Sequence, residues 1–138
     1  MADGQPGFSR RLGIERIRAE EGHSELRLAI GPDHLNELGI VHGGVLMTLA
    51  DEAIGMAAFT SVPPGTAVVT AELHVHFLMP ARRGTLVARG HVWRAGRRLV
   101  TGEAVIELHD GHHPPEVVAR ATGTWATVTP AVPLPASE

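Results

Sequence analysis

The chain has 138 residues, of which 43% are hydrophobic and 20% charged, and its formal net charge is −3. This composition is typical of one globular domain, and the negative balance argues against nucleic-acid binding. The absence of cysteine excludes disulfides, thiolate metal ligands and a cysteine nucleophile. The first residues lack the pattern of a signal peptide, and acids within the longest apolar stretch argue against a membrane helix. We therefore expect a cytoplasmic protein without membrane contact.

Composition divides the chain into one domain and two tails. Residues 1–9 are predicted to be a flexible N-terminal tail, and the proline-rich residues 129–138 to be an extended or disordered C-terminal tail. Residues 10–128 are the predicted domain, without a linker or an internal repeat.

In chain order, weak evidence predicts a strand over 11–20, and alternating apolar residues predict a second one ending near Ile30. After a loop over 34–41, the longest apolar segment predicts a helix over 43–60, which Pro63-Pro64-Gly65 ends. A period of two then predicts four strands, at 69–77, 85–94, 98–109 and 116–128.

The order of these elements predicts the fold class. Two strands, one long helix and four strands joined by hairpin-length turns indicate an α+β fold in which a six-stranded antiparallel sheet wraps around one central helix. The helix is too apolar to be covered by one face of a sheet. We therefore expect a second copy of the chain to pack against it.

Asp51 is an acid in the middle of the apolar helix. A buried carboxylate costs several kcal/mol unless it is paired or hydrogen-bonded, so a fold that keeps one there either satisfies it structurally or uses it. Glu52 lies about 100° around the helix and is the competing candidate. Asp51 shares one small or polar stripe with Gly44, Thr48 and Gly55.

His42, Gly43 and Gly44 precede or open the predicted helix. Backbone N–H groups at a helix start are unpaired and carry the positive end of the helix dipole, and glycine lets a ligand carbonyl approach closely. Gly43 is therefore a candidate donor to a reacting carbonyl oxygen. The alternative is that the two glycines form a tight entry turn.

Upstream of Asp51, the chain has the pattern Asn-x-x-Gly-x-x-His-Gly-Gly, formed by Asn36, Gly39, His42, Gly43 and Gly44, and Asp51 follows nine residues after His42. In this pattern the chain resembles the hotdog-fold thioesterases, specifically the PaaI-like (phenylacetate-degradation) branch of acyl-CoA thioesterases, over residues 20–128. The resemblance implies hydrolysis of an acyl-CoA or aryl-CoA thioester, with the acid acting as general base or as nucleophile.

The resemblance also implies roles for other residues. Thr70 would hold the attacking water, although an exposed strand threonine is the alternative. Asn36 would bind the carbonyl or the water, or form a turn. His42 would assist carbonyl polarisation or cap the loop. Arg97 and Arg98, together with Gly44, are the candidate substrate-binding residues, because arginine pairs well with the phosphates of CoA.

Helix geometry adds a constraint. Gly43 and Asp51 are eight residues apart, which is about 12 Å along the axis, whereas reacting groups must lie about 3 Å apart. The site must therefore combine Gly43 of one subunit with Asp51 of another, as the resemblance also implies. We expect a homodimer or a dimer-of-dimers homotetramer.

No cofactor is expected. His74 and His76 share one strand face and other histidines flank a turn, but a metal site needs three or four converging ligands. The alternatives to a thioesterase are a hotdog hydratase or dehydratase and a non-catalytic acyl-CoA binding protein.

Overall fold

A computed structural model describes residues 7–129 as one sheet with a long helix in its concave face. A short 3-10 turn, Pro32–His34, follows the second strand. The helices and strands are α1 (Gly7–Leu12), β1 (Glu15–Glu20), β2 (His23–Ala29), α2 (Gly43–Phe59), β3 (Ala67–Phe77), β4 (Thr85–Ala95), β5 (Leu99–His109) and β6 (Glu116–Val128).

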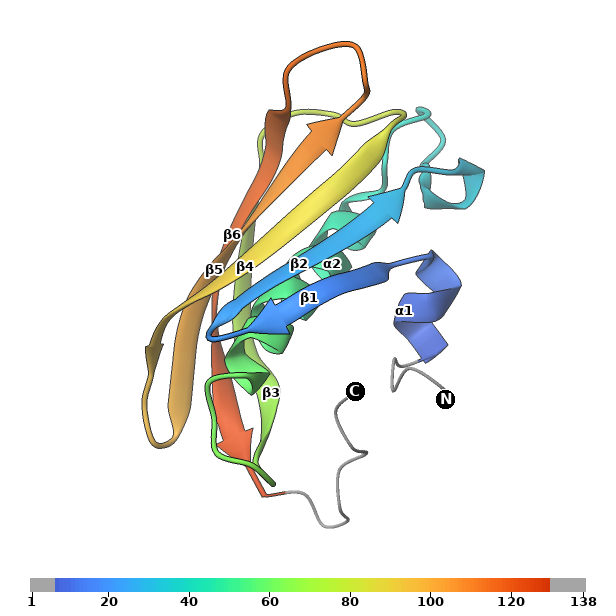
Figure 1. Ribbon diagram of the computed structural model, residues 1–138. Helices are drawn as coiled ribbons and strands as arrows, with labels where there is room; N and C mark the ends of the chain where they lie inside the picture. The colour runs from blue at the N-terminus through green and yellow to red at the C-terminus, as the bar shows by residue number, and fades with distance from the viewer. Residues whose placement is uncertain (1–6, 130–138) are drawn as a thin grey trace.

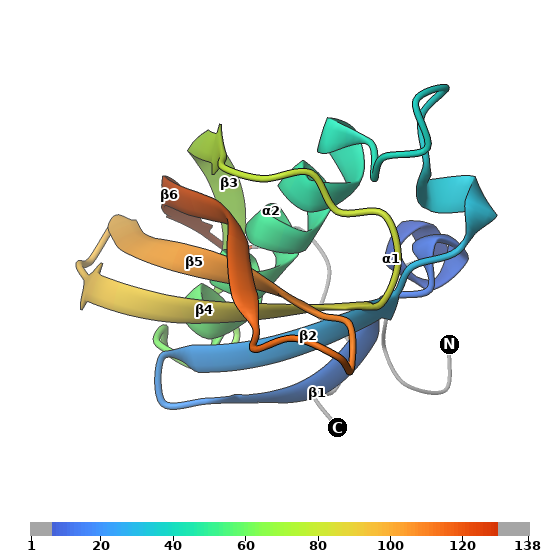
Figure 2. The same cartoon turned by 90° about the horizontal axis from the view of Figure 1, so that it is seen from above.

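The six strands are all antiparallel to their neighbours, in the order β1-β2-β4-β5-β6-β3. The sheet curls around α2, so that β1 and β3, the two edge strands, lie on either side of the helix (Figures 1 and 2). This arrangement confirms the predicted six-stranded antiparallel sheet around one long helix. No helix within residues 7–129 has the length and apolar character needed to span a membrane.

The N-terminal part of the domain differs from the prediction. Helix α1 overlaps the end of the predicted tail, 1–9, and β1 begins at Glu15 instead of near residue 11. Six residues are too few to show a helical period in the sequence, and the helix is anchored by Ser9, which is buried. The rest of the two predicted tails, 1–6 and 130–138, lies outside the described residues.

Helix α2 lies very close to β4. A β-carbon at Gly90 would lie 2.2 Å from the carbonyl oxygen of Ala53, so only glycine fits there. The buried Ser24 hydroxyl donates to the same carbonyl at 2.6 Å and accepts the Gly90 N–H at 3.2 Å. This contact fixes both the distance and the rotation of the helix on the sheet.

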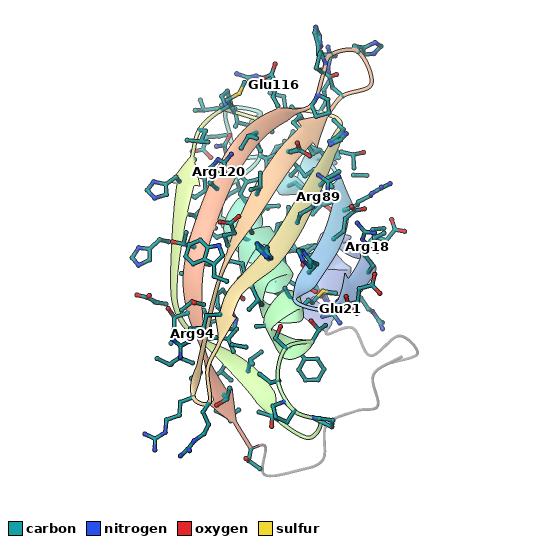
Figure 3. The ribbon with its side chains drawn as sticks, turned by 60° about the vertical axis from the view of Figure 1, so that its left-hand side comes forward. Arg18, Glu21, Arg89, Arg94, Glu116 and Arg120 are labelled. Carbon is teal, nitrogen blue, oxygen red and sulfur yellow. The ribbon has the colours of Figure 1, made fainter. Side chains whose placement is uncertain are left out.

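A strip of α2 is left uncovered by its own chain. The sequence predicts a helix buried almost all round, but Met47 and Phe59 are 42% and 40% exposed and Gly44 is also exposed. The opposite, outer face of the sheet carries charged side chains, among them Arg89 and Arg120 (Figure 3). Arg89 pairs there with Glu25 and Glu107. The uncovered apolar surface is thus on the helix side.

A β-bulge in β3 changes which way Thr70 faces. The register with β6 shifts between Thr70 and Glu72, so Thr70 lies opposite Trp125 and Glu72 opposite Thr124. Trp125 is buried, and a β-carbon at Gly55 of α2 would meet its indole nitrogen. Strict alternation predicts Thr70 on the face of Glu72, whereas the bulge turns it toward the helix. Bulges often aim a side chain in this way next to active sites.

We expect Gly90→Ala to lower the free energy of unfolding by about 3 kcal/mol, the upper end of the usual cost of overpacking. The added methyl group would meet backbone, which cannot give way without moving α2. Urea unfolding at fixed protein concentration measures the change. Gly31→Ala is the matched control, because Gly31 has an extended backbone and its β-carbon would make an ordinary contact at 3.9 Å. Equal stability of the two variants would contradict the close contact.

Candidate active site

Asp51 of α2 is hydrogen-bonded to Thr70 of β3. The Thr70 hydroxyl donates to Asp51 Oδ1 at 2.6 Å. Asp51 is half-buried, and Thr70 is exposed in the single chain. Within residues 7–129, no hydrogen bond engages Asp51 Oδ2, and the Thr70 oxygen keeps lone pairs that can accept one, so the pair can hold a water molecule and accept its proton.

Glu52 has a structural partner instead. Arg16 of β1 contacts its Oε1 through Nε at 3.0 Å and Nη2 at 2.9 Å, and the Glu52 side chain is only 13% exposed. Because β1 and β3 lie on opposite sides of α2 (Figure 2), the two neighbouring acids point to different edges of the sheet. This geometry favours Asp51 over Glu52 as the reactive acid.

His42 caps the start of α2. Its Nδ1 accepts the Gly44 N–H at 2.9 Å, and its carbonyl oxygen accepts the Val45 N–H at 2.9 Å. Among residues 7–129, the Gly43 N–H donates to no acceptor. The capping alternative for His42 is therefore what the structure shows. The Gly43 N–H is therefore free, whereas the Gly44 N–H is bonded to the His42 ring.

Phe77, at the end of β3, lies beside Gly43. A β-carbon at Gly43 would lie 3.5 Å from the Phe77 ring carbons Cε1 and Cζ, and Phe77 is 52% exposed. The sequence marks Phe77 only as an apolar strand residue. Its place at the helix start comes from the antiparallel course of α2 and β3, which no sequence signal reveals.

Asn36 organises the loop before the helix. Its Oδ1 accepts the N–H groups of Leu38 and Ile40 at 2.9 and 3.2 Å. Arg82 also holds this loop by donating a hydrogen bond to the Leu38 carbonyl oxygen at 3.1 Å. The carbonyl end of the Asn36 side chain is thus used for the turn, which leaves its amide NH₂ as the end that can reach a substrate.

The predicted site residues form separate groups within one chain. Gly43 and Asp51 are about 12 Å apart along α2. Arg97 and Arg98 are exposed in the β4–β5 hairpin, near the C-terminal end of α2 (Figure 1). One chain therefore does not bring all of them to one reacting carbonyl.

Within residues 7–129, no three His, Cys, Asp or Glu side chains are placed to hold a metal ion. His112 and His113, in the turn before β6, form hydrogen bonds with Asp110. The backbone N–H of His112, followed by the side chain and backbone of His113, holds the pKa of Asp110 far below its usual range. On the outer face of β3, the Thr124 hydroxyl and then His74 lower the pKa of Glu72.

Comparison with known families settles the relationship. A family model described as the thioesterase superfamily matches residues 38–114, more than half of the chain. The chain belongs to the thioesterase superfamily. Its fold is the hotdog fold, and its reaction class is thioester hydrolysis.

Individual relatives agree with this assignment. The protein SSO1253 of Saccharolobus solfataricus is 34% identical over 114 residues, covering 83% of this thioesterase and 73% of the relative. Human acyl-coenzyme A thioesterase 13 is 30% identical over 94 residues, covering 67% and 66% of the two chains. The structure of the E. coli PaaI protein, from the phenylacetic acid degradation operon, superposes with a TM-score of 0.80 at 26% identity, covering 90% and 86%. The thioesterase is PaaI-like.

We expect a double-mutant cycle to show that Arg16 and Glu52 form a structural pair. Arg16→Met should lower the free energy of unfolding by about 2 kcal/mol, because it leaves a mostly buried carboxylate without its charged donor. Adding Glu52→Gln should recover about 1 kcal/mol, since it removes that charge. Chemical denaturation of the four proteins at one concentration measures the coupling. Additive effects would contradict the pairing.

Proposed function

We propose that this thioesterase hydrolyses an acyl-CoA or aryl-CoA thioester to the free acid and CoA, using Asp51 to activate water. The observation that carries the proposal is the Asp51–Thr70 hydrogen bond on the uncovered side of α2, in a chain of the thioesterase superfamily. The name of the human relative, an acyl-coenzyme A thioesterase, supports the CoA ester as substrate class. Hydrolysis fits these findings better than hydration, dehydration or binding without turnover.

In the proposed reaction, a water molecule lies between Asp51 Oδ2 and the Thr70 hydroxyl oxygen. Thr70 donates a hydrogen bond to Asp51 Oδ1 and keeps its proton, so the lone pairs of its oxygen can accept a hydrogen bond from the water and orient it. As the water oxygen attacks the carbonyl carbon, Asp51 Oδ2 accepts the water proton that is not hydrogen-bonded to Thr70. The C–S bond then breaks, CoA leaves as the thiolate, and the proton held on Asp51 can pass to it. Attack by Asp51 itself, through an anhydride, is the alternative route.

The negative charge that develops on the carbonyl oxygen requires a donor. The free Gly43 N–H at the positive end of α2 has the properties of an oxyanion hole, because it is fixed by the helix and aligned with its dipole. Removing one such donor typically costs a hundredfold to a thousandfold in rate, in the order of magnitude known for other enzymes. His42 would fix this donor, and Asn36 and Gly44 would border the bound carbonyl.

We infer that Gly43 comes from a second copy of the chain. Strand β3 is a long edge strand with the half-exposed apolar residues Val69 and Phe77, and such edges invite pairing with another strand. Across a two-fold axis, β3 would pair antiparallel with its copy, and the two α2 helices would also run in opposite directions.

The contacts within one chain suggest the register of this pairing. Phe77 marks the position of Gly43 along β3, and Thr70 marks that of Asp51. A register in which residue 70 lies opposite residue 77 of the copy, centred between Leu73 and His74, therefore sets the helix start of one subunit beside the acid of the other. It would also cover the uncovered strip of α2.

The other parts of the expected assembly stay predictions. Arg97 and Arg98 are exposed, and within residues 7–129 their side chains form no hydrogen bond or ion pair, so they can pair with CoA phosphates. The homotetramer and the cytoplasmic location rest on the sequence alone.

We expect Asp51→Asn to lower turnover by on the order of a hundredfold to ten-thousandfold, because the amide cannot accept the water proton. Straight-chain acyl-CoAs and benzoyl-CoA are the substrates, and release of free thiol is the measurement. Glu52→Gln is the matched control, since Glu52 pairs with Arg16 away from Thr70. Near-normal turnover in Asp51→Asn, with loss in Glu52→Gln, would mean that the wrong acid has been chosen. If the wild-type protein releases no thiol from any of these esters, the proposed substrate class is wrong.

We expect mixed dimers to recover activity. Gly43→Pro deletes the proposed donor but suits the helix start, because the backbone of His42 (φ −60°, ψ 136°) is already extended as proline requires of its predecessor. Homodimers of Gly43→Pro and of Asp51→Asn should both be inactive. Their mixed dimer would hold one intact site and recover up to half of the activity per dimer.

Two controls accompany the mixing experiment. Gly43→Ala makes the same contact with Phe77 but keeps the N–H, so it should stay active. The two variants carry different affinity tags, and two successive affinity purifications, one for each tag, establish that mixed dimers form. Mixed dimers without activity, or an active monomer in sedimentation at micromolar concentration, would favour a site within one chain.

A further inference from the structure

His34, in the 3-10 turn after β2, is a buried histidine whose two ring nitrogens both have partners. Nδ1 accepts the Gly31 N–H at 2.9 Å. Nε2 lies 2.6 Å from the carbonyl oxygen of Leu12, the last residue of α1. Since Nδ1 must offer a lone pair to Gly31, the ring proton is on Nε2 and is donated to Leu12. The side chain therefore joins α1 to the turn in a fixed orientation.

The backbone of His34 carries this connection to the start of α2. The His34 carbonyl oxygen accepts the N–H of His42 at 2.8 Å. His42 is the N-cap of α2, and its ring holds the Gly44 N–H. A bridge between Leu35 and Val41 closes the loop between them. A continuous path of hydrogen bonds thus runs from α1 through His34 and His42 to the helix start.

We propose that His34 is a positioning residue for the Gly43 N–H, and that through it α1 is part of the scaffold of the active site. The proposal rests on the proposed function of Gly43. A tilt of the His34 carbonyl would move His42 and, with it, the first turn of α2. Because a misplacement of about 1 Å can cost on the order of a hundredfold in rate, a side chain that touches no substrate can still control turnover.

The loop also has ties that do not involve the His34 ring. Val41 donates its N–H to the Ala81 carbonyl at 2.8 Å, and Arg82 holds the Leu38 carbonyl. These ties hold the loop on the sheet, so loss of the His34 ring should displace the helix start without unfolding the domain. The expected defect is therefore one of alignment.

Three substitutions separate the two ring contacts. His34→Phe keeps a ring of similar size and removes both hydrogen bonds. His34→Asn places an acceptor near the position of Nδ1 and can keep the Gly31 contact. His34→Gln places an N–H donor near the position of Nε2 and can keep the Leu12 contact. We measure kcat and KM for benzoyl-CoA and straight-chain acyl-CoAs, together with the ¹H–¹⁵N signals of Gly43 and Gly44.

Thr60→Val is the matched control. The Thr60 hydroxyl also makes two hydrogen bonds, accepting the Gly22 N–H at 2.8 Å and donating to the Ala57 carbonyl at 2.7 Å, but at the other end of α2. We expect Thr60→Val to lower the free energy of unfolding about as much as His34→Phe does. The signals of Gly43 and Gly44 and the value of kcat should stay unchanged.

For His34→Phe we expect kcat to fall on the order of tenfold to a hundredfold, with KM within about threefold and with shifted Gly43 and Gly44 signals. His34→Asn and His34→Gln should each recover part of the rate. The proposal is overturned if His34→Phe keeps its kcat within about twofold, or loses rate while both signals stay in place. If the wild-type protein hydrolyses none of these esters but the signals still shift, the positioning role stands and the proposed function fails.

Discussion

The contact between α2 and β4 at Gly90 is the constraint on which the site depends. Ala53 faces the sheet there, with its carbonyl held by Ser24. Each residue turns the helix by about 100°, so Asp51 lies about 200° from Ala53, almost on the far side of the helix. The curled edge of the sheet, β3, reaches that side (Figure 2). A helix rotated by one residue would place Glu52, instead of Asp51, beside Thr70.

The rotation of α2 on the sheet gives Asp51 and Glu52 different surroundings. Glu52, next in sequence, meets Arg16 and becomes part of the packing between α2 and β1. Asp51 meets a hydroxyl and open space. A mostly buried carboxylate whose charge is compensated by an arginine is a poor base for a water molecule, whereas Asp51 has a single neutral donor. The structural role of Glu52 and the proposed reactive role of Asp51 therefore depend on which edge strand each acid faces.

The start of the helix shows a second division, between Gly43 and Gly44. The cap made by His42 uses the Gly44 N–H and leaves that of Gly43 free. His34 and Asn36 then hold the segment that leads into the cap, the first through its ring and carbonyl and the second through an Asx-type turn. The free Gly43 N–H thus belongs to a loop that several hydrogen bonds hold in place, which is how a preorganised donor differs from a frayed helix end.

The sequence by itself determined the fold class, the long helix and the strands β4, β5 and β6 nearly to the residue, because each has a clear period and is bounded by turn residues. It also singled out Asp51, Gly43 and Thr70, through an acid in an apolar helix and through family resemblance. Only the tertiary structure decided that β3 is an edge strand, that the bulge turns Thr70 toward Asp51, and that Arg16 takes Glu52. Helix α1 and His34 also came from the structure alone. The physical reason is range: periodicity and turn chemistry act between residues close in the chain, whereas strand order, helix rotation and ion pairing join residues far apart in it.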